Sequence, residues 1–187
     1  YDSGRRLFPF NLILAKEIEN LKELISKIHL NDQKILDVGT GTGSVLYLFP
    51  TTSSVFAADS SFRMIHQARQ KHSARFVVAE SSMLPFKSYS FHLTTAIGLF
   101  EYHKNRLGFL NELKRITDPN GFIIVTYSQI GLLNYLRISL GHKIYLITYK
   151  KFISLLAPCG LTVKLFKKSL LQRQVLIHRN AEEITNY

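Results

Sequence analysis

The stretch Lys34-Ile-Leu-Asp-Val-Gly-Thr-Gly-Thr-Gly43 decides the fold of this 187-residue chain. Strand-like residues run directly into three glycines at alternate positions, Gly39, Gly41 and Gly43. The apolar run Ser44-Val-Leu-Tyr-Leu-Phe49 follows at once and predicts a helix, which Pro50 ends. Glycines lack the Cβ atoms that would keep a ligand from the backbone, and a helix N-terminus offers unpaired N–H groups. The stretch therefore predicts a ligand-binding loop between a strand and a helix.

The segments around this stretch alternate between strand-like and helix-like patterns. Short apolar runs predict strands at 34–38, 54–58, 75–79, 91–97 and 122–127. Apolar residues at three- and four-residue steps predict helices at 11–29, 62–72 and 106–116, and Ser61 can cap the second. Strands that alternate with helices predict parallel pairing with right-handed crossovers. We therefore expect an α/β fold, a Rossmann-like, doubly wound and mostly parallel sheet with helices on both faces.

The C-terminal part of the chain follows a different pattern. The sequence Asp118-Pro-Asn-Gly121 predicts a turn just before the strand at 122–127. Residues 149–157 predict a helix that Pro158 and Gly160 break. Two strands at 161–166 and 174–178 are joined by a short connection, so we expect an antiparallel pair at an edge of the sheet.

Composition narrows the class of protein. Apolar residues make up 46% and charged residues 20%, which is typical of a globular domain, and no apolar run reaches the roughly 20 residues of a membrane helix. The single cysteine, Cys159, excludes an internal disulfide and a multi-cysteine zinc site, and we expect a reducing, cytoplasmic location. The net charge of +11 favours anionic partners such as nucleic acid, acidic lipid or a phosphorylated substrate. The sequence begins at Tyr1 without methionine, so the numbering can start inside a longer gene product.

The spacing of the glycines excludes the two commonest phosphate loops. Nucleotide hydrolases need Gly-Lys-Ser/Thr and dinucleotide enzymes need Gly-x-Gly-x-x-Gly, and neither pattern fits here. Two acids follow the next strands instead, Asp59 twenty residues after Gly39, and Glu80. An acid at the first of these positions can accept hydrogen bonds from two ribose hydroxyls. This layout favours a nucleoside with a short polar tail.

These residues carry a family resemblance. The ordered motifs Asp37-Val-Gly-Thr-Gly-Thr-Gly43, Asp59-Ser-Ser, Glu80-Ser-Ser-Met-Leu-Pro-Phe86, Ser90-Phe91 and Asp118-Pro-Asn-Gly121 resemble those of class I S-adenosylmethionine-dependent methyltransferases. The likeness is greatest to the small-molecule branch that includes quinone- and lipid-biosynthesis enzymes. The resemblance spans about residues 34–127, with a weaker similarity in Gly160-Leu-Thr-Val163.

The resemblance implies a cofactor, S-adenosylmethionine, with S-adenosylhomocysteine as the product and no metal. It implies that the glycine loop holds the methionine portion, that Asp59 holds the ribose, and that Glu80 and Ser81 border the adenine. The implied cofactor residues are Asp37, Gly39, Thr40, Gly41, Gly43, Asp59, Ser60, Met64, Glu80, Ser81, Ser82, Ile97 and Gly98. Two residues depart from the family pattern, which often has Asp in place of Glu80 and an acid in place of His92.

We expect a single methyltransferase domain over residues 1–187. Its parts would be an N-terminal helical segment (1–33), a cofactor-binding core (34–127), a substrate lid (128–148), and a C-terminal helix with edge strands (149–187). The lid is apolar with basic residues between, which suits a small-molecule or lipid-like acceptor or contact with an anionic membrane. The alternative is an ordinary helix packed on the core.

Methyl transfer by in-line displacement needs no metal or covalent nucleophile, and it needs a general base only when the acceptor must lose a proton. No catalytic residue is settled, and the candidates are His103, Glu101 and Tyr102, while Tyr1, Arg5 and Arg6 are candidates to close over the site. Two other functions remain open. One is an RNA methyltransferase, favoured by the charge but lacking the Asn/Asp-Pro-Pro-aromatic motif of base-amine enzymes. The other is a non-catalytic accessory protein that binds the cofactor.

Overall fold

The structure is a computed structural model, and it describes residues 10–179 of the chain. A seven-stranded sheet in the order β3-β2-β1-β4-β5-β7-β6 forms its centre. Strands β1 to β5 are parallel, and β7 runs antiparallel to both of its neighbours, β5 and β6. The strands are β1 (Lys34–Val38), β2 (Ser54–Asp59), β3 (Arg75–Val78), β4 (Phe91–Ala96), β5 (Thr117–Ser128), β6 (Leu161–Lys168) and β7 (Gln172–Arg179). The expected Rossmann-like α/β fold with a C-terminal antiparallel pair is confirmed.

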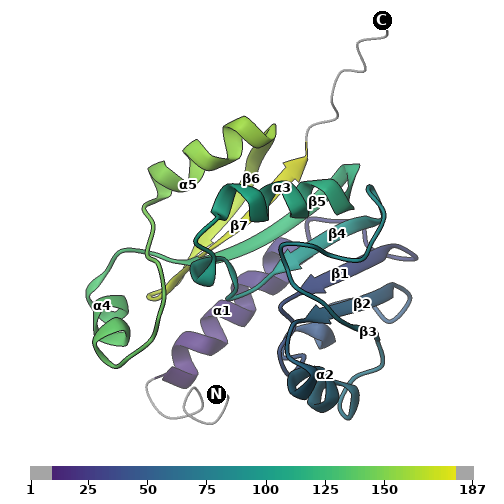
Figure 1. Ribbon diagram of the computed structural model, residues 1–187, viewed down its shortest axis with the longest axis horizontal. Coiled ribbons are helices and arrows are strands. Elements are labelled where there is room, and N and C mark those ends of the chain that lie inside the picture. The colour runs from purple at the N-terminus through teal and green to yellow at the C-terminus, as the bar shows by residue number, and fades with distance from the viewer. Residues whose placement is uncertain (1–9, 180–187) are drawn as a thin grey trace, which may run out of the picture.

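Helices lie on both faces of the sheet (Figure 1). The α-helices are α1 (Phe10–Ile25), α2 (Phe62–Arg69), α3 (Arg106–Ile116), α4 (Leu132–Ser139) and α5 (Tyr149–Leu156), with short 3₁₀ turns η2 (Leu46–Leu48), η3 (Phe100–Tyr102) and η4 (Ala157–Cys159). On one face, Leu24 of α1 packs in a buried cluster with Ile35 and Ile124. On the other face, α3 and α5 bury Leu110 and Phe152 in a second cluster. Helices thus cover both faces of the sheet. The ends of its strands remain available for a ligand-binding site.

Side-chain caps begin three of the helices. The Ser61 hydroxyl accepts a hydrogen bond from the Met64 N–H (3.3 Å), which confirms the predicted cap of α2. Asn105 accepts from Gly108 (2.9 Å) at the start of α3, and Thr148 accepts from Lys151 (3.2 Å) at the start of α5. These bonds satisfy N–H groups that the helix itself cannot pair.

The predicted helix directly after the glycines is wrong. Only one 3₁₀ turn, η2, forms there. Pro50 forces the residue before it out of helical geometry, and Phe49 is extended (φ −85°, ψ 146°). The glycine loop is therefore followed by no helix long enough to present a dipole.

The predicted turn at 118–121 forms inside β5. Asp118 accepts a hydrogen bond from the Asn120 N–H (2.9 Å), as expected of a turn-forming aspartate. Thr117 already pairs with Phe91, and pairing resumes between Phe122 and Leu93. The turn is thus a bulge within a longer strand, not a boundary before it.

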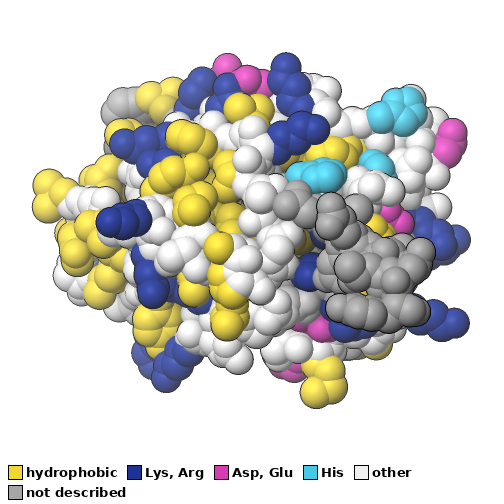
Figure 2. Space-filling view, turned by 90° about the horizontal axis from the view of Figure 1, so that it is seen from above, with side chains coloured by type: hydrophobic (Ala, Val, Ile, Leu, Met, Phe, Trp, Pro, Cys, Tyr) yellow, Lys and Arg dark blue, Asp and Glu magenta, His cyan; other side chains and the backbone are white. Residues whose placement is uncertain are grey.

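Helix α4 lies away from the sheet, at the end of the molecule toward which β1 and β4 point (Figure 1). Two connections hold this region to the start of β7. The Gln129 side chain donates to the Ser169 carbonyl (3.0 Å), and the Asn134 side chain donates to the Leu171 carbonyl (2.7 Å). Figure 2 shows hydrophobic and basic side chains gathered at this end of the molecule.

Candidate functional site

The candidate site lies where the parallel strands end. Asp37 is paired with Thr95 of β4 and Ala57 of β2, and Asp59 is paired with Val78 of β3. The residues that follow these strands therefore share one edge of the sheet. Ligands of parallel α/β sheets bind at this carboxyl edge.

The three glycines of the loop have left-handed backbones, with φ of +70° at Gly39, +54° at Gly41 and +81° at Gly43. A Cβ on Gly39 would lie 2.8 Å from a Leu99 methyl, and a Cβ on Gly43 would lie 2.6 Å from the His72 ring. A Cβ on Gly41 would meet no atom within 4 Å. A side chain at either outer position would require Leu99 or His72 to move, whereas the middle glycine borders open space in which a ligand could lie.

The N–H groups of the loop are largely used within the protein. Those of Gly39 and Thr40 donate to the Ala58 carbonyl (2.8 and 3.0 Å), and that of Gly43 donates to the Thr40 carbonyl (2.9 Å). The Gly41 N–H donates to Asp59 Oδ2 (2.8 Å). The unpaired N–H groups expected at a helix N-terminus after the loop are also missing from this loop, because most of its own N–H groups are paired and only a 3₁₀ turn follows it. The loop leaves open space beside Gly41 but offers few free N–H groups. This agrees with the glycine spacing, which excluded a phosphate-binding loop.

Replacement of Gly41 by alanine is expected to leave the fold intact and to weaken ligand binding at the loop. The cost to folding is the left-handed backbone alone, about 1 kcal/mol, because the added methyl meets nothing. Urea unfolding and calorimetric ligand titration would separate the two effects. If affinity stays unchanged in the folded variant, the ligand does not approach Gly41.

The carboxylate of Asp59 organises the loop and keeps capacity for a ligand. Oδ2 accepts from Gly41 and Oδ1 accepts from the Ser61 N–H (2.9 Å). An ionised carboxylate has about four acceptor positions, so two such bonds leave room for two hydroxyl donors. Asp59 is only partly buried, so those positions are accessible.

Asp37 is a buried acid at the same edge, 1% exposed. The Thr95 hydroxyl donates to its Oδ1 (2.6 Å). Burial raises the pKa of Asp37 to about 6, against the opposite effect of the Thr95 and Thr40 hydroxyls. A cationic group of a ligand nearby would stabilise the charged form.

The other predicted cofactor residues surround these two acids. Ser60, Glu80 and Ser82 are exposed, and Met64, Ser81, Ile97 and Gly98 are partly exposed. The Gly98 N–H donates to Thr126 Oγ1 (2.6 Å). The cofactor role of the whole set remains a prediction. His92, the second departure from the family pattern, lies at the start of β4, away from this edge, and packs its ring edge-on against Phe122.

Of the three catalytic candidates, His103 lines the cavity that is described below. Its Nε2 lies 3.1 Å from the Ser81 hydroxyl, and its ring stacks on Phe109 with centroids 3.9 Å apart. Burial lowers the pKa of His103, while the charge of Glu80 raises it. The imidazole is therefore neutral near pH 7 and able to accept a proton.

The other two candidates are placed differently. Glu101 is 1% exposed, and its carboxylate accepts a hydrogen bond from the Ser128 hydroxyl (3.1 Å). Tyr102 is 40% exposed and does not line the cavity. Tyr1, Arg5 and Arg6 lie outside the described residues.

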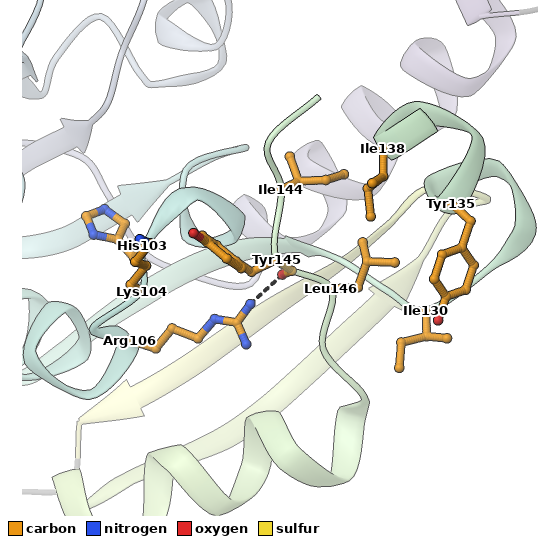
Figure 3. A pocket seen from close by; sticks show the side chains of 9 residues that line it. All are labelled: His103, Lys104, Arg106, Ile130, Tyr135, Ile138, Ile144, Tyr145 and Leu146. Atoms are coloured by element: carbon orange, nitrogen blue, oxygen red, sulfur yellow. Dashed lines mark hydrogen bonds between the residues drawn. The ribbon is translucent and has the colours of Figure 1, made fainter. Parts of the chain in front are cut away.

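The cavity has a volume of about 530 Å³ and opens beside His103 (Figure 3). Its walls combine the segment after β4 with α4 and its flanks. Arg106 closes one side by donating to the Tyr145 carbonyl, shown as the dashed line in Figure 3. The lining residues are His103, Lys104, Arg106, Ile130, Tyr135, Ile138, Ile144, Tyr145 and Leu146. Ser81 and His103 thus join the predicted adenine edge to a largely apolar cavity.

Sequence reasoning missed four polar residues at this edge. Thr95 and Thr126 bind Asp37 and Gly98, and Ser128 binds Glu101. Gln172 places its side-chain nitrogen 3.9 Å from where a Gly98 Cβ would lie. The polar residues at the ends of β4 and β5 could have been recognised in the sequence as candidates for this edge. The position of Gln172 could not, because it begins an antiparallel strand more than 70 residues after Gly98.

Across residues 10–179, no group of three or more His, Cys, Asp or Glu side chains could hold a metal.

Residues 36–125, which contain the glycine loop, both acids and Gly98, match a protein family described as a methyltransferase domain. The chain therefore contains a methyltransferase domain over these residues. The family resemblance predicted from the motifs is confirmed.

Individual methyltransferases resemble this chain at modest identity. A demethylmenaquinone methyltransferase of Thermotoga maritima is 29% identical over 129 residues, covering 67% of this chain and 55% of the relative. A malonyl-[acyl-carrier protein] O-methyltransferase of Marinomonas sp. is 28% identical over 118 residues, covering 58% and 44%. The chain thus spans about half the length of these curated relatives.

A solved structure supports the fold over a longer range. The magnesium protoporphyrin IX methyltransferase of Synechocystis PCC 6803, crystallised with bound S-adenosylhomocysteine, superposes with a TM-score of 0.77. The match covers 90% of this chain and 84% of that one at 16% identity. At that identity the likeness concerns the fold alone.

Proposed function

We propose that this methyltransferase binds S-adenosylmethionine at the carboxyl edge and methylates a hydrophobic small-molecule or lipid-like acceptor. The observation that carries the proposal is the cavity of about 530 Å³ that begins at His103, next to the predicted adenine edge. The named substrates of the relatives, a demethylmenaquinone and a malonyl-acyl-carrier protein, are consistent with acceptors other than nucleic acid. A cytoplasmic location stays a prediction from the sequence.

The residues at the edge fit this cofactor. The open space at Gly41 suits a ligand chain lying against backbone, and Asp59 keeps acceptor positions for two ribose hydroxyls. The buried carboxyl of Asp37 suits the methionine ammonium, because a nearby cation would stabilise its charged form. Glu80, Ser81 and Met64 would border the adenine. When bound, S-adenosylmethionine supplies a methyl group that its sulfonium has already activated.

The protein's own part is to bind the acceptor, exclude water and take up a proton. Ile130, Ile138 and Leu146 give the cavity apolar walls that favour a hydrophobic acceptor over water. In the tautomer in which Nε2 of His103 donates to the Ser81 hydroxyl, Nδ1 can accept a proton from an acceptor that must lose one. Ser81 therefore connects the positions of cofactor and base.

Replacement of His103 by glutamine tests this role through the pH profile. The wild-type rate should fall only below the ordinary histidine pKa of 6.5, because burial lowers the pKa of His103. The variant should lose that acidic limb while its affinity for S-adenosylmethionine changes by less than about threefold. An acidic limb that persists unchanged in the variant would assign the base elsewhere.

The proposal as a whole is tested by a methyl-transfer screen that measures S-adenosylhomocysteine formation. The acceptor pools would be lipid extracts, quinone-like phenols, small amines and RNA. Transfer to a lipid or quinone-like pool is expected. Transfer to RNA alone would instead support a nucleic-acid methyltransferase, and cofactor binding without transfer to any pool would support an accessory protein.

A further inference from the structure

Helix α4 has its polar side chains inside and its apolar side chains outside. Asn134 is 1% exposed and Arg137 is half-buried, whereas Leu132 is 84% and Leu136 52% exposed. A helix that packs on a protein core shows the reverse arrangement. An exposed apolar surface of this kind is typical of a site that contacts a protein or a membrane.

Hydrogen bonds hold α4 in this orientation. The Asn134 side chain donates to the carbonyls of Gln129 (2.8 Å) and Leu171 (2.7 Å). Arg137 donates to Asn134 Oδ1 (2.8 Å) and to the Ser128 hydroxyl (3.1 Å). Rotating the helix to bury its leucines would break these bonds at buried positions, which is costly. The hydrogen bonds of Asn134 and Arg137 thus fix the helix with its apolar side facing outward.

Apolar side chains next to α4 extend the same surface. We call the whole set the α4 face: Ile130, Leu132, Leu133, Tyr135, Leu136, Ile138, Leu140, Tyr145 and Leu170, each exposed. Leu170 belongs to the turn between β6 and β7, which the bonds of Gln129 and Asn134 hold beside α4. Ile130, Tyr135, Ile138 and Tyr145 also line the cavity, so the face surrounds the cavity's apolar side.

The chain segments that form and flank the α4 face carry basic residues and no acidic ones. Residues 119–180 contain no Asp or Glu, and nine basic residues: Arg137, Lys143, Lys150, Lys151, Lys164, Lys167, Lys168, Arg173 and Arg179. Lys143 and Lys168 are exposed within and beside the face, and Lys104 lies at the cavity. In Figure 2 the left end of the molecule shows hydrophobic and basic side chains together, and the visible acidic side chains lie elsewhere.

We propose that the α4 face docks on an anionic lipid bilayer, with its leucines and tyrosines in the interface and its lysines on lipid headgroups. Apolar contact combined with basic residues is what binds a protein to the surface of such a membrane. No helix within residues 10–179 is long and apolar enough to cross a bilayer, so the contact is peripheral. Docking would bring the cavity to the membrane, where a lipid-like acceptor can enter it. Only that last step rests on the proposed function.

A tryptophan reporter tests the docking directly. The chain contains no tryptophan, so Leu136→Trp introduces a single tryptophan on the α4 face. Its emission should shift to the blue with vesicles of mixed phosphatidylcholine and phosphatidylglycerol, and much less with phosphatidylcholine alone. The shift should weaken as salt is added, because salt screens the lysine contacts. A Tyr47→Trp reporter, at an exposed site on η2, should not respond.

Sedimentation with the same vesicles supplies matched variants without tryptophan. The double variant Leu132→Gln with Leu136→Gln should reduce binding by about tenfold or more, since it removes apolar insertion. Lys143→Glu with Lys168→Glu should also reduce it, whereas Lys71→Glu, after α2, should not. Circular dichroism would show that each variant is folded.

Three results would overturn the proposal. One is vesicle binding that the leucine variant leaves unchanged. Another is a concentration-dependent dimer, or a face covered by residues 1–9, with no vesicle binding. The third is salt-sensitive binding of an RNA oligonucleotide in place of vesicles. Vesicle binding is measured without cofactor, so failure of cofactor binding in calorimetry would refute the proposed function and leave the docking standing.

Discussion

Replacing Asp59 by alanine is expected to weaken the binding of S-adenosylmethionine by about 1–3 kcal/mol, or roughly fivefold to 150-fold. The carboxylate has two remaining acceptor positions for the ribose hydroxyls, and it also holds the Gly41 N–H at 2.8 Å. The variant thus loses ligand contacts and loosens the loop that borders the cofactor. Isothermal titration calorimetry of the two proteins gives the difference in affinity.

Two control variants distinguish the loss of the ribose contact from a displacement of the glycine loop. Asp59→Asn keeps an oxygen that can accept from Gly41 but loses the charge, so its affinity should lie between those of the wild type and Asp59→Ala. Glu19→Ala removes an exposed acid of α1 that pairs with Lys16, and it should bind the cofactor like the wild type. Equal affinities in all four proteins would mean that Asp59 does not hold the ribose.

Replacing Asp37 by asparagine is expected to increase the free energy of unfolding near neutral pH while it weakens cofactor binding. The pKa of Asp37 is about 6 in the folded protein against 3.8 as the reference value. Its raised pKa favours the folded state below pH 3.8, and this stabilisation is lost as pH rises to about 6. Above that pH the folded protein carries a buried charge, which asparagine removes at a gain of roughly 1–3 kcal/mol.

Urea unfolding of both proteins across pH checks this prediction. The difference between variant and wild type should be constant above about pH 7 and should shrink as pH falls from 6 toward 4, where Asp37 is protonated. Other titrating groups cancel in the difference, and the asparagine side chain of the variant can still accept from Thr95. A difference that does not depend on pH would show that Asp37 is not a buried charge. Such a trade of stability for binding is common at functional sites.

The sequence predicted the central sheet well because its signals are local. Most of the parallel strands contain a short apolar run, and Asp59 and Glu80 lie at or after the ends of their strands, at positions that parallel pairing must bring together. The cap at Ser61 and the bounds of α3 also depend on neighbouring residues only. These parts of the fold could therefore be read without knowledge of distant contacts.

Two features of the glycine stretch were not predicted correctly, for different reasons. The apolar run at 44–49 favoured a helix, but Pro50 and the six residues available allowed only one 3₁₀ turn, which is a local effect. The pairing of the loop amides was not predicted, because it depends on β2, where Ala58 and Asp59 accept from them after folding.

The polarity of α4 illustrates the same limit. Its leucines at 132, 133, 136 and 140 predicted a lid or a helix on the core, and composition alone could not say which side chains turn inward. The orientation depends on Asn134 and Arg137, whose partners lie at Ser128 and Leu171. The role of residues 128–148 as a substrate lid accordingly remains a proposal.

Calorimetric titration of the folded wild-type chain with S-adenosylmethionine and S-adenosylhomocysteine is the most direct measurement of the central claim. One ligand should bind per chain, S-adenosylhomocysteine should compete with S-adenosylmethionine for the same site, and Gly41→Ala and Asp59→Ala should both weaken binding. A folded sample that gives no heat with either compound, at concentrations that saturate a positive-control methyltransferase, would contradict the account.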